Sequence, residues 1–186
     1  MAEPFIKAIE VKLEDFFTKV LSTIGRITDK QIAELLKKSK QTVSVAESVT
    51  GGLIASRLTS VPGSSEYFIG SLVAYHPRIK VIQLGISASL ISRHGAVSKE
   101  VAVAMAEEIK KRFKTDIGIA ATGAAGPAPV PPAPVGKVYI AVASPKSTEW
   151  KELNLQGTRP EIRKKTTQAV LGLLWLHLGG DEVLKH

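Results

Sequence analysis

A serine followed closely by two glycines is the first candidate for chemistry in this sequence. Ser48 ends an apolar run that begins at Thr42, and Thr50, Gly51 and Gly52 come directly after it. We expect a buried strand, a tight turn and then a helix, which places the serine at the sheet edge where ligands bind. The turn's N–H groups could then hold an oxyanion or a phosphate. Helix capping by the same residues is the simpler alternative.

A lysine is the best candidate for the base that such a serine needs. The sequence has four histidines, and none of them is an obvious partner for Ser48. Lys80 has apolar neighbours, and burial would lower its pKa towards neutrality. Tyr75 ends a predicted strand and Thr122 follows another, so all four side chains can converge if these loops share one edge of the sheet. A surface lysine and a solvent-facing tyrosine remain the alternative interpretation.

Composition narrows the class of protein. The 186 residues include no cysteine, which excludes disulfides and thiol catalysis. No apolar run is long enough to span a membrane and no signal peptide is evident, so we expect a cytoplasmic protein. The net charge is +8, but basic residues are scattered and aromatic residues make up only 5%, so nucleic acid is not an expected partner. No metal-ligand motif or dinucleotide-binding unit is present, so we expect neither a metal nor a cofactor.

Alternating strand and helix patterns predict a single α/β domain, with a mixed, mostly parallel sheet flanked by helices. Strands are expected at 42–47, 67–75, 116–121, 137–143 and 149–155, the last one at an edge, and 122–135 is expected to be a loop. Helices are expected at 28–38, 52–59, 77–84, 88–92, 98–114 and 158–178. Capping boxes begin the first and last of these helices. We divide the chain into an N-terminal helical extension (1–27), the domain (28–180) and a tail (181–186).

Taken together, the motifs resemble the C-terminal domain of the competence/damage-inducible CinA proteins, with its stand-alone nicotinamide mononucleotide deamidases. The resemblance spans about residues 31–178. The matching motifs are, in order, Ala46-Glu-Ser-Val-Thr-Gly-Gly52, Val61-Pro-Gly-Ser-Ser65, Val73-Ala-Tyr75 with Lys80, Leu84-Gly-Ile86, His94-Gly-Ala-Val-Ser98, Ala104-Met-Ala106, Thr122-Gly-x-x-Gly-Pro127 and Pro134-Val-Gly136.

The resemblance implies hydrolysis of the nicotinamide mononucleotide carboxamide to nicotinic acid mononucleotide and ammonia. It makes Ser48 the nucleophile, Lys80 the general base and Tyr75 the hydroxyl partner of that lysine. The residues it implies for substrate binding are Glu47, Thr50, Gly51, Gly52, Thr122, Gly123, Arg159 and Arg163. One of the two arginines matches an essential arginine of the family, and the sequence leaves open which one.

One loop departs from the family pattern. After Pro127 the family continues with glycines and an acid, whereas this chain reads Ala128-Pro-Val-Pro-Pro-Ala-Pro134. Proline removes an N–H and fixes φ, so a non-catalytic nucleotide-binding or regulatory protein is a second hypothesis. A third is an interaction module that uses the N-terminal helix. The wide apolar faces of the N-terminal helix, expected within residues 5–24, and of the last helix lead us to expect a homodimer or higher homo-oligomer.

Overall fold

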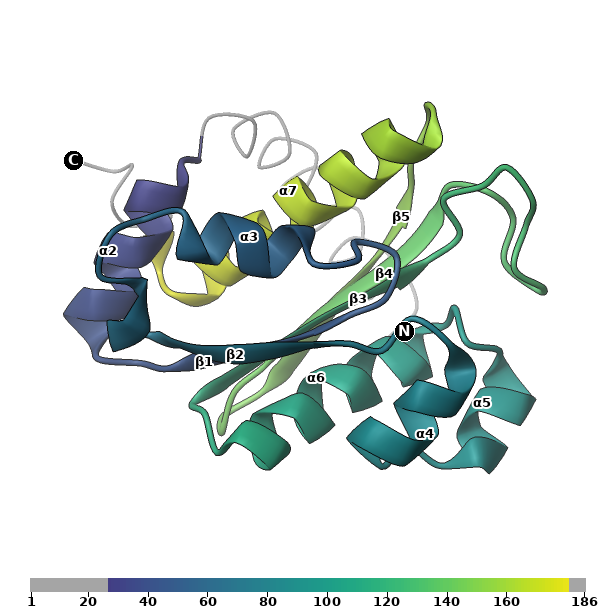
Figure 1. Ribbon diagram of the computed structural model, residues 1–186, viewed down its shortest axis with the longest axis horizontal. Coiled ribbons are helices and arrows are strands. Elements are labelled where there is room, and N and C mark those ends of the chain that lie inside the picture. Colours follow the sequence, from purple (N-terminus) through teal and green to yellow (C-terminus); the bar gives the residue numbers. More distant parts are fainter. Residues whose placement is uncertain (1–26, 181–186) are drawn as a thin grey trace, which may run out of the picture.

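The computed structural model describes residues 27–180, which form a five-stranded mixed sheet between two layers of helices (Figure 1). The strand order is β2-β1-β3-β4-β5, and the strands are β1 (Val43–Glu47), β2 (Phe68–Val73), β3 (Ile117–Gly123), β4 (Lys137–Ala143) and β5 (Thr148–Asn154). β1 is parallel to β2 and β3, and β4 is antiparallel to β3 and β5. Four of these five strands therefore run in one direction, as the sequence predicts. The predicted extension and tail lie outside the described residues.

The helices divide between the two faces of the sheet (Figure 1). On one face lie α2 (Asp29–Ser39), α3 (Leu53–Thr59) and α7 (Arg159–His177). On the other lie α4 (Pro77–Leu84), α5 (Ala88–His94) and α6 (Lys99–Phe113). A short 3-10 helix, η1 (Ser64–Glu66), leads into β2. Both predicted capping boxes are present, at the starts of α2 and α7.

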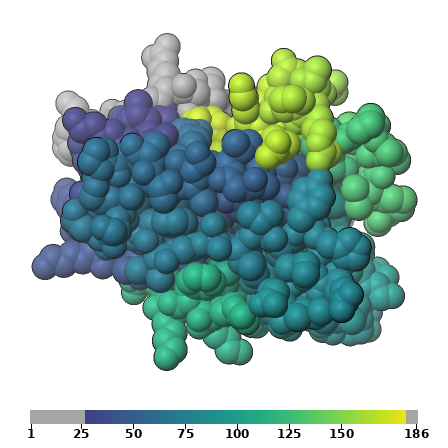
Figure 2. Space-filling model, viewed as in Figure 1, coloured from purple at the N-terminus to yellow at the C-terminus, as the bar shows by residue number. Residues whose placement is uncertain are grey.

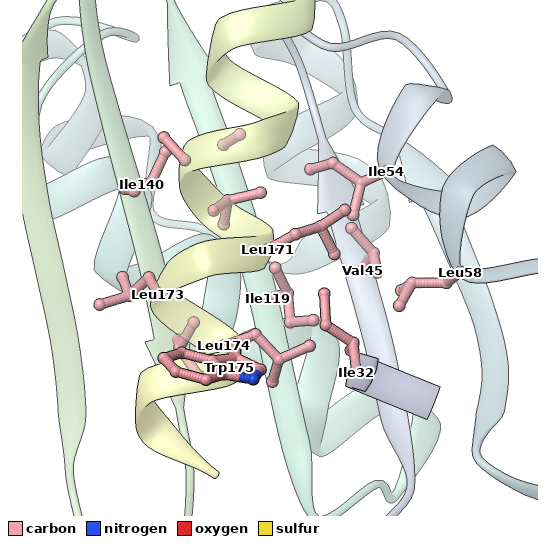
Figure 3. Packing of buried hydrophobic residues seen from close by; sticks show 14 of the residues in the cluster. Ile32, Val45, Ile54, Leu58, Ile119, Ile140, Leu171, Leu173, Leu174 and Trp175 are labelled. Atoms are coloured by element: carbon pink, nitrogen blue, oxygen red, sulfur yellow. The ribbon is translucent and has the colours of Figure 1, made fainter. Parts of the chain in front are cut away.

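The two hydrophobic cores differ in the size of their side chains. Towards α7, large residues pack in one cluster, which includes Val45, Ile119, Leu171, Leu174 and Trp175 (Figure 3). Towards α6, the strands contribute mainly alanine, which lets the helix approach closely. A Cβ added at Gly118 would lie 2.0 Å from a backbone carbonyl of α6. Burial on both faces explains why β1, β3 and β4 read as near-continuous apolar runs.

The segments that carry the candidate residues all lie at one edge of the sheet. The carboxyl ends of β1, β2, β3 and β5 lie at this edge, together with the start of β4. From it leave the Ser48 turn, the Tyr75 segment, the 124–136 loop and the connection to α7. In Figure 2 the loop (green), the start of α7 (yellow-green) and the α4–α5 region (teal) all lie at the right-hand end of the molecule.

One expectation about this edge was wrong. Thr122 and Gly123 were assigned to the loop, but they belong to β3, where they pair with Tyr139 and Val138 of β4. A glycine normally weakens a strand, and the antiparallel partner that extends this one comes 14 residues later in the chain. Tertiary pairing therefore overrides the local preference for a loop.

Candidate active site

A cavity of about 260 Å³ lies at this edge of the sheet. It is lined by six of the residues singled out in the sequence, namely Ser48, Tyr75, Lys80, Thr122, Gly123 and Arg159. The remaining lining residues are Val49, His76, Pro77, Ala96, Val97, Ala125, Gly126, Ala128 and Val130. The topology thus brings together side chains that are up to 111 positions apart in the chain.

Ser48 and Lys80 form a buried pair in this cavity. The Lys80 Nζ lies 2.9 Å from the Ser48 Oγ and also donates to the Ala74 carbonyl at 2.6 Å. Lys80 is 1% exposed, and its burial lowers the pKa of the ammonium group to about 8. A lysine with such a pKa is partly neutral near physiological pH and can accept a proton from the serine.

The start of α4 explains how a lysine reaches the interior. His76 caps this helix by accepting from the Arg78 N–H, and Pro77 occupies the first turn. Lys80 follows one turn later, on the side that faces the sheet. Charged side chains are rarely buried unless paired, so the surface interpretation was the better estimate from sequence. The structure shows that it does not hold.

Tyr75 lies at the mouth of the cavity and is 56% exposed. Its hydroxyl accepts a hydrogen bond from the Arg159 Nη2 at 2.5 Å. The hydrogen bonds of the Lys80 Nζ go to Ser48 and Ala74. Tyr75 is therefore paired with an arginine here, and the Ala74 carbonyl has the place that the resemblance gives to the tyrosine. A main-chain carbonyl leaves no signal in the side-chain sequence.

Arg159 and Arg163 have different environments. Arg159 lines the cavity, where it also donates to the Gly126 carbonyl at 2.6 Å. Arg163 instead donates to the carbonyls of Val49 and Thr50, at 3.2 and 2.7 Å, and so holds the turn after the nucleophile. Arg159 is thus the guanidinium available to a ligand, and Arg163 supports the backbone.

The turn after Ser48 differs from the expectation. We expected the start of α3 to offer free N–H groups to an anion, but the Glu47 carboxylate accepts from the N–H groups of Gly52, Ile54 and Ala55. Glu47 is fully buried, and the cavity lining includes neither it nor Thr50, Gly51 or Gly52. The Glu47 carboxylate therefore takes the N–H groups that we expected a ligand anion to take. It can do so because it lies at the end of a strand that is followed by the helix after a short turn, and this contact could not be predicted from the sequence.

Thr122 connects two walls of the cavity. Its hydroxyl donates to the Ala96 carbonyl at 2.8 Å, and the side chain is 1% exposed. This bond ties the end of β3 to the segment that precedes α6. Ala96 and Val97 also line the cavity; they belong to the His94–Ser98 motif, but their apolar side chains gave no reason to predict a role in the site.

The proline-rich segment forms the remaining wall. Val130 and Ala133 exchange two backbone hydrogen bonds, of 3.1 and 2.8 Å, and close a small hairpin. Gly126, Ala128 and Val130 from this segment line the cavity. The wall is apolar and poor in N–H groups, because five of the eight residues 127–134 are proline.

Two further features of the described residues bear on the class of site. Within 27–180, His, Asp and Glu side chains nowhere gather in a group of three that could hold a metal ion. In the same part of the chain, each helix is too short or too polar to cross a bilayer.

Known proteins share both this sequence and this architecture. A protein from Dictyoglomus thermophilum named "CinA-like protein" is 42% identical over 175 residues, which is 94% of this chain and 42% of that protein. A "Putative competence-damage inducible protein" from Desulforudis audaxviator is also 42% identical, and 42% of its length is covered. The chain thus spans less than half the length of these relatives.

Among solved structures, the competence/damage inducible protein CihA from Agrobacterium tumefaciens is similar, with a TM-score of 0.73 and 33% identity. That match covers 80% of this chain and 96% of the other. The family model described as "CinA C-terminal domain" matches residues 26–178. The chain therefore belongs to the CinA C-terminal domain family.

Proposed function

We propose that this protein is an amidohydrolase that converts nicotinamide mononucleotide to nicotinic acid mononucleotide and ammonia. The observation that carries the proposal is the 2.9 Å contact between the Ser48 Oγ and the Nζ of a lysine that is 1% exposed. A serine next to a partly neutral lysine can attack an otherwise unreactive carboxamide. Family membership and the enclosed cavity support the same assignment.

The first half of the reaction forms an acyl-enzyme. Neutral Lys80 takes the Ser48 hydroxyl proton while the Oγ attacks the carboxamide carbon, which gives a tetrahedral intermediate. The protonated lysine then returns this proton to the amide nitrogen. The C–N bond breaks, ammonia leaves, and the carboxyl group remains esterified to Ser48.

The second half regenerates the enzyme. Water attacks the ester carbon, and Lys80 takes one proton from it. The C–O bond to Ser48 breaks, and the lysine returns the proton to the serine oxygen. The product is a carboxylic acid, which ionises at neutral pH. The Ala74 carbonyl stays hydrogen-bonded to the Nζ and keeps it directed at Ser48 throughout.

A main-chain donor next to the nucleophile suits the developing oxyanion. The Ser48 N–H is engaged by the Ala121 carbonyl, and the Gly52 N–H by Glu47. The Val49 N–H has no acceptor among the described residues, and Val49 lines the cavity. A single donor of this type contributes about 3–4 kcal/mol to transition-state stability.

Arg159 is the group we assign to the substrate phosphate. Its guanidinium lies in the cavity wall and is held by Tyr75 and Gly126, which fixes its plane. A fixed guanidinium can grip a phosphate bidentately. The carboxamide would then lie at Ser48 and the phosphate at the mouth.

The hairpin of residues 126–134 favours a second candidate function. Its prolines leave few N–H groups for a ligand, so a protein that binds nucleotides without turning them over is consistent with this wall. Binding without ammonia release would identify that function.

Ammonia release from nicotinamide mononucleotide, with the acid product identified by mass, tests the proposal. Wild-type protein is expected to turn over, and Ser48→Ala to lose activity. Ser56→Ala, on α3 and outside the cavity lining, is the matched control and should retain activity. Turnover that survives in Ser48→Ala would rule out this nucleophile, and binding with no turnover in wild-type protein would favour the regulatory function.

A further inference from the structure

We propose that Glu47 is a positioning residue, which holds the turn that presents Ser48 in the geometry required for attack. The inference rests on the proposed function only for the role of Ser48 as nucleophile. Sequence similarity placed Glu47 among the substrate contacts, and its surroundings indicate a different role.

Both carboxylate oxygens of Glu47 accept hydrogen bonds from the protein backbone. Its Oε2 accepts from the N–H groups of Gly52 and Ile54, at 2.8 and 3.2 Å, and its Oε1 accepts from Ala55 at 2.9 Å. The residue is 0% exposed. Hydrogen bonds to an ionised acceptor are stronger than neutral ones, and a carboxylate also suits the positive end of a helix.

The position of Glu47 in the chain makes these bonds relevant to the nucleophile. Glu47 is the last residue of β1, where it is paired with Val73 and Ala121. Its backbone is therefore fixed by the sheet while its side chain is fixed to the start of α3. Only residues 48–51 lie between these two anchors, so the carboxylate determines the path of the turn.

Arg163 holds the same turn through its carbonyl groups. Arg163 donates to the carbonyls of Val49 and Thr50, while Glu47 accepts from the N–H of Gly52. The Glu47 carboxylate thus fixes the N–H group at the end of the turn, and the Arg163 guanidinium fixes two of its carbonyl groups. Together they fix the backbone on which the Ser48 Oγ meets Lys80.

The same bonds argue against a substrate contact. Glu47 does not line the cavity, and its carboxylate takes the N–H groups at the start of α3. A substrate anion placed there would face carboxylate oxygens in place of free N–H groups. The effect of Glu47 on catalysis therefore passes through the position of Ser48.

The test compares Glu47→Gln with a control at Asp116, which directly precedes β3 and contacts the residue before the other end of β1. The control is Asp116→Asn. In the wild-type protein the Asp116 carboxylate accepts from the Thr42 N–H and hydroxyl, at 2.8 and 2.7 Å, just before β1 begins. Both variants replace a carboxylate that caps backbone, but only one of them is next to Ser48. Circular dichroism and thermal unfolding establish that each variant is folded.

The main measurement is the rate at which a fluorophosphonate probe labels Ser48, because this reaction requires no nucleotide. Glu47→Gln is expected to be labelled roughly tenfold to a hundredfold more slowly, since small displacements of a reacting group have effects of this size. The kcat for nicotinamide mononucleotide should fall in parallel while KM changes little. Asp116→Asn should be labelled at the wild-type rate.

The inference is overturned if folded Glu47→Gln is labelled at the wild-type rate, if only KM changes, or if Asp116→Asn slows labelling equally. Should Glu47→Gln not fold, Glu47→Asp keeps the charge but shortens the side chain, and unchanged labelling of that variant would also overturn the inference. Wild-type protein that is labelled at Ser48 but releases no ammonia would contradict the proposed function alone, because the labelling comparison still tests Glu47.

Discussion

Arg159 and Arg163 lie one helical turn apart on α7 but hold different parts of the site. Arg159 donates to the Tyr75 hydroxyl and the Gly126 carbonyl, at the mouth of the cavity. Arg163 donates to two carbonyls of the turn after Ser48. Two side chains of equal charge on one helix face are therefore assigned to ligand binding and to backbone support.

Arg159→Ala is expected to lower the activity on nicotinamide mononucleotide more than the activity on the riboside. Loss of a charged hydrogen-bonding group to phosphate should lower kcat/KM for nicotinamide mononucleotide by roughly tenfold to a hundredfold. The riboside, which has no phosphate, should be affected much less. Equal losses on both substrates, measured by ammonia release, would contradict a phosphate contact.

Arg163→Ala is the companion variant and should behave differently. It removes the Arg163 donor from the carbonyls of Val49 and Thr50, of which Thr50 keeps a bond from the Leu53 N–H, so we expect a destabilisation of about 1–3 kcal/mol. Activity should fall to the same degree on mononucleotide and riboside. Denaturant unfolding and the ratio of the two activities check this expectation, and a change in the ratio would place Arg163 at the substrate.

The activity should depend on pH through Lys80. The catalytic base must be neutral, and burial lowers the pKa of Lys80 to about 8. We therefore expect kcat/KM to rise about tenfold per pH unit below 8 and to level off above it. Fluorophosphonate labelling of Ser48 should follow the same curve. A profile that is flat from pH 6 to 9 would exclude the neutral lysine as the base.

Replacing Lys80 by methionine should abolish activity and stabilise the fold at neutral pH. The folded pKa of about 8 lies below the usual 10.5, so the unfolded chain binds this proton more tightly. The shift corresponds to about 3 kcal/mol, and the lost bond to Ala74 offsets about 1–2 kcal/mol of it. A net gain of about 1–2 kcal/mol is expected at pH 7.

This gain in Lys80→Met should shrink as the pH rises from 8 to 10.5. In that window the folded protein has already lost the proton and the unfolded chain still holds it, so wild-type stability increases relative to the variant. Urea unfolding at pH 7, 9 and 10.5 measures the difference. A variant that is less stable than wild type at pH 7 would show that burial of this ammonium group costs little.

Thr50→Val tests whether the Thr50 hydroxyl contacts the substrate or is only a buried polar group. The Thr50 Oγ1 is buried and has no hydrogen-bond partner among the described residues, and Thr50 does not line the cavity. Valine has the same shape, so stability should stay equal or rise by about 1 kcal/mol, with activity unchanged.

Thr166→Val provides the contrast for this substitution. The Thr166 hydroxyl is also buried, but it donates to the Ile162 carbonyl at 2.7 Å, so its loss should cost about 1 kcal/mol. Thermal unfolding compares the two variants. A drop in kcat/KM for Thr50→Val, with stability unchanged, would return Thr50 to the substrate site.

Much of the fold could be predicted because its signals are local. The two capping boxes, at Thr28 and Thr158, and the apolar run of 137–143 each specify their own element. The end of β3 could not be predicted, because Thr122 and Gly123 become strand only through pairing with β4. Long-range pairing has no signature within a few residues of the chain.

The site was predictable only in outline. That Ser48 and Lys80 could meet was a conditional prediction, which depended on the rule that ligand sites lie where strand ends share one edge of the sheet. The burial of Lys80 and its bond to the Ala74 carbonyl depend on how α4 packs, which its sequence does not specify. The difference between Arg159 and Arg163 was also hidden, since a spacing of four residues places both on one side of a helix.

The convergence of distant segments on one sheet edge has a consequence for how reactivity arises. Ser48, Lys80 and Arg159 meet only when β1, β2 and β5 have all joined the sheet, so no single pair of neighbouring elements holds the complete set. Contacts this far apart in sequence form late, after the entropy of closing long loops has been overcome. An incompletely folded chain would therefore carry an ordinary serine and an ordinary lysine, so under the proposed function the onset of turnover would report the fully assembled domain.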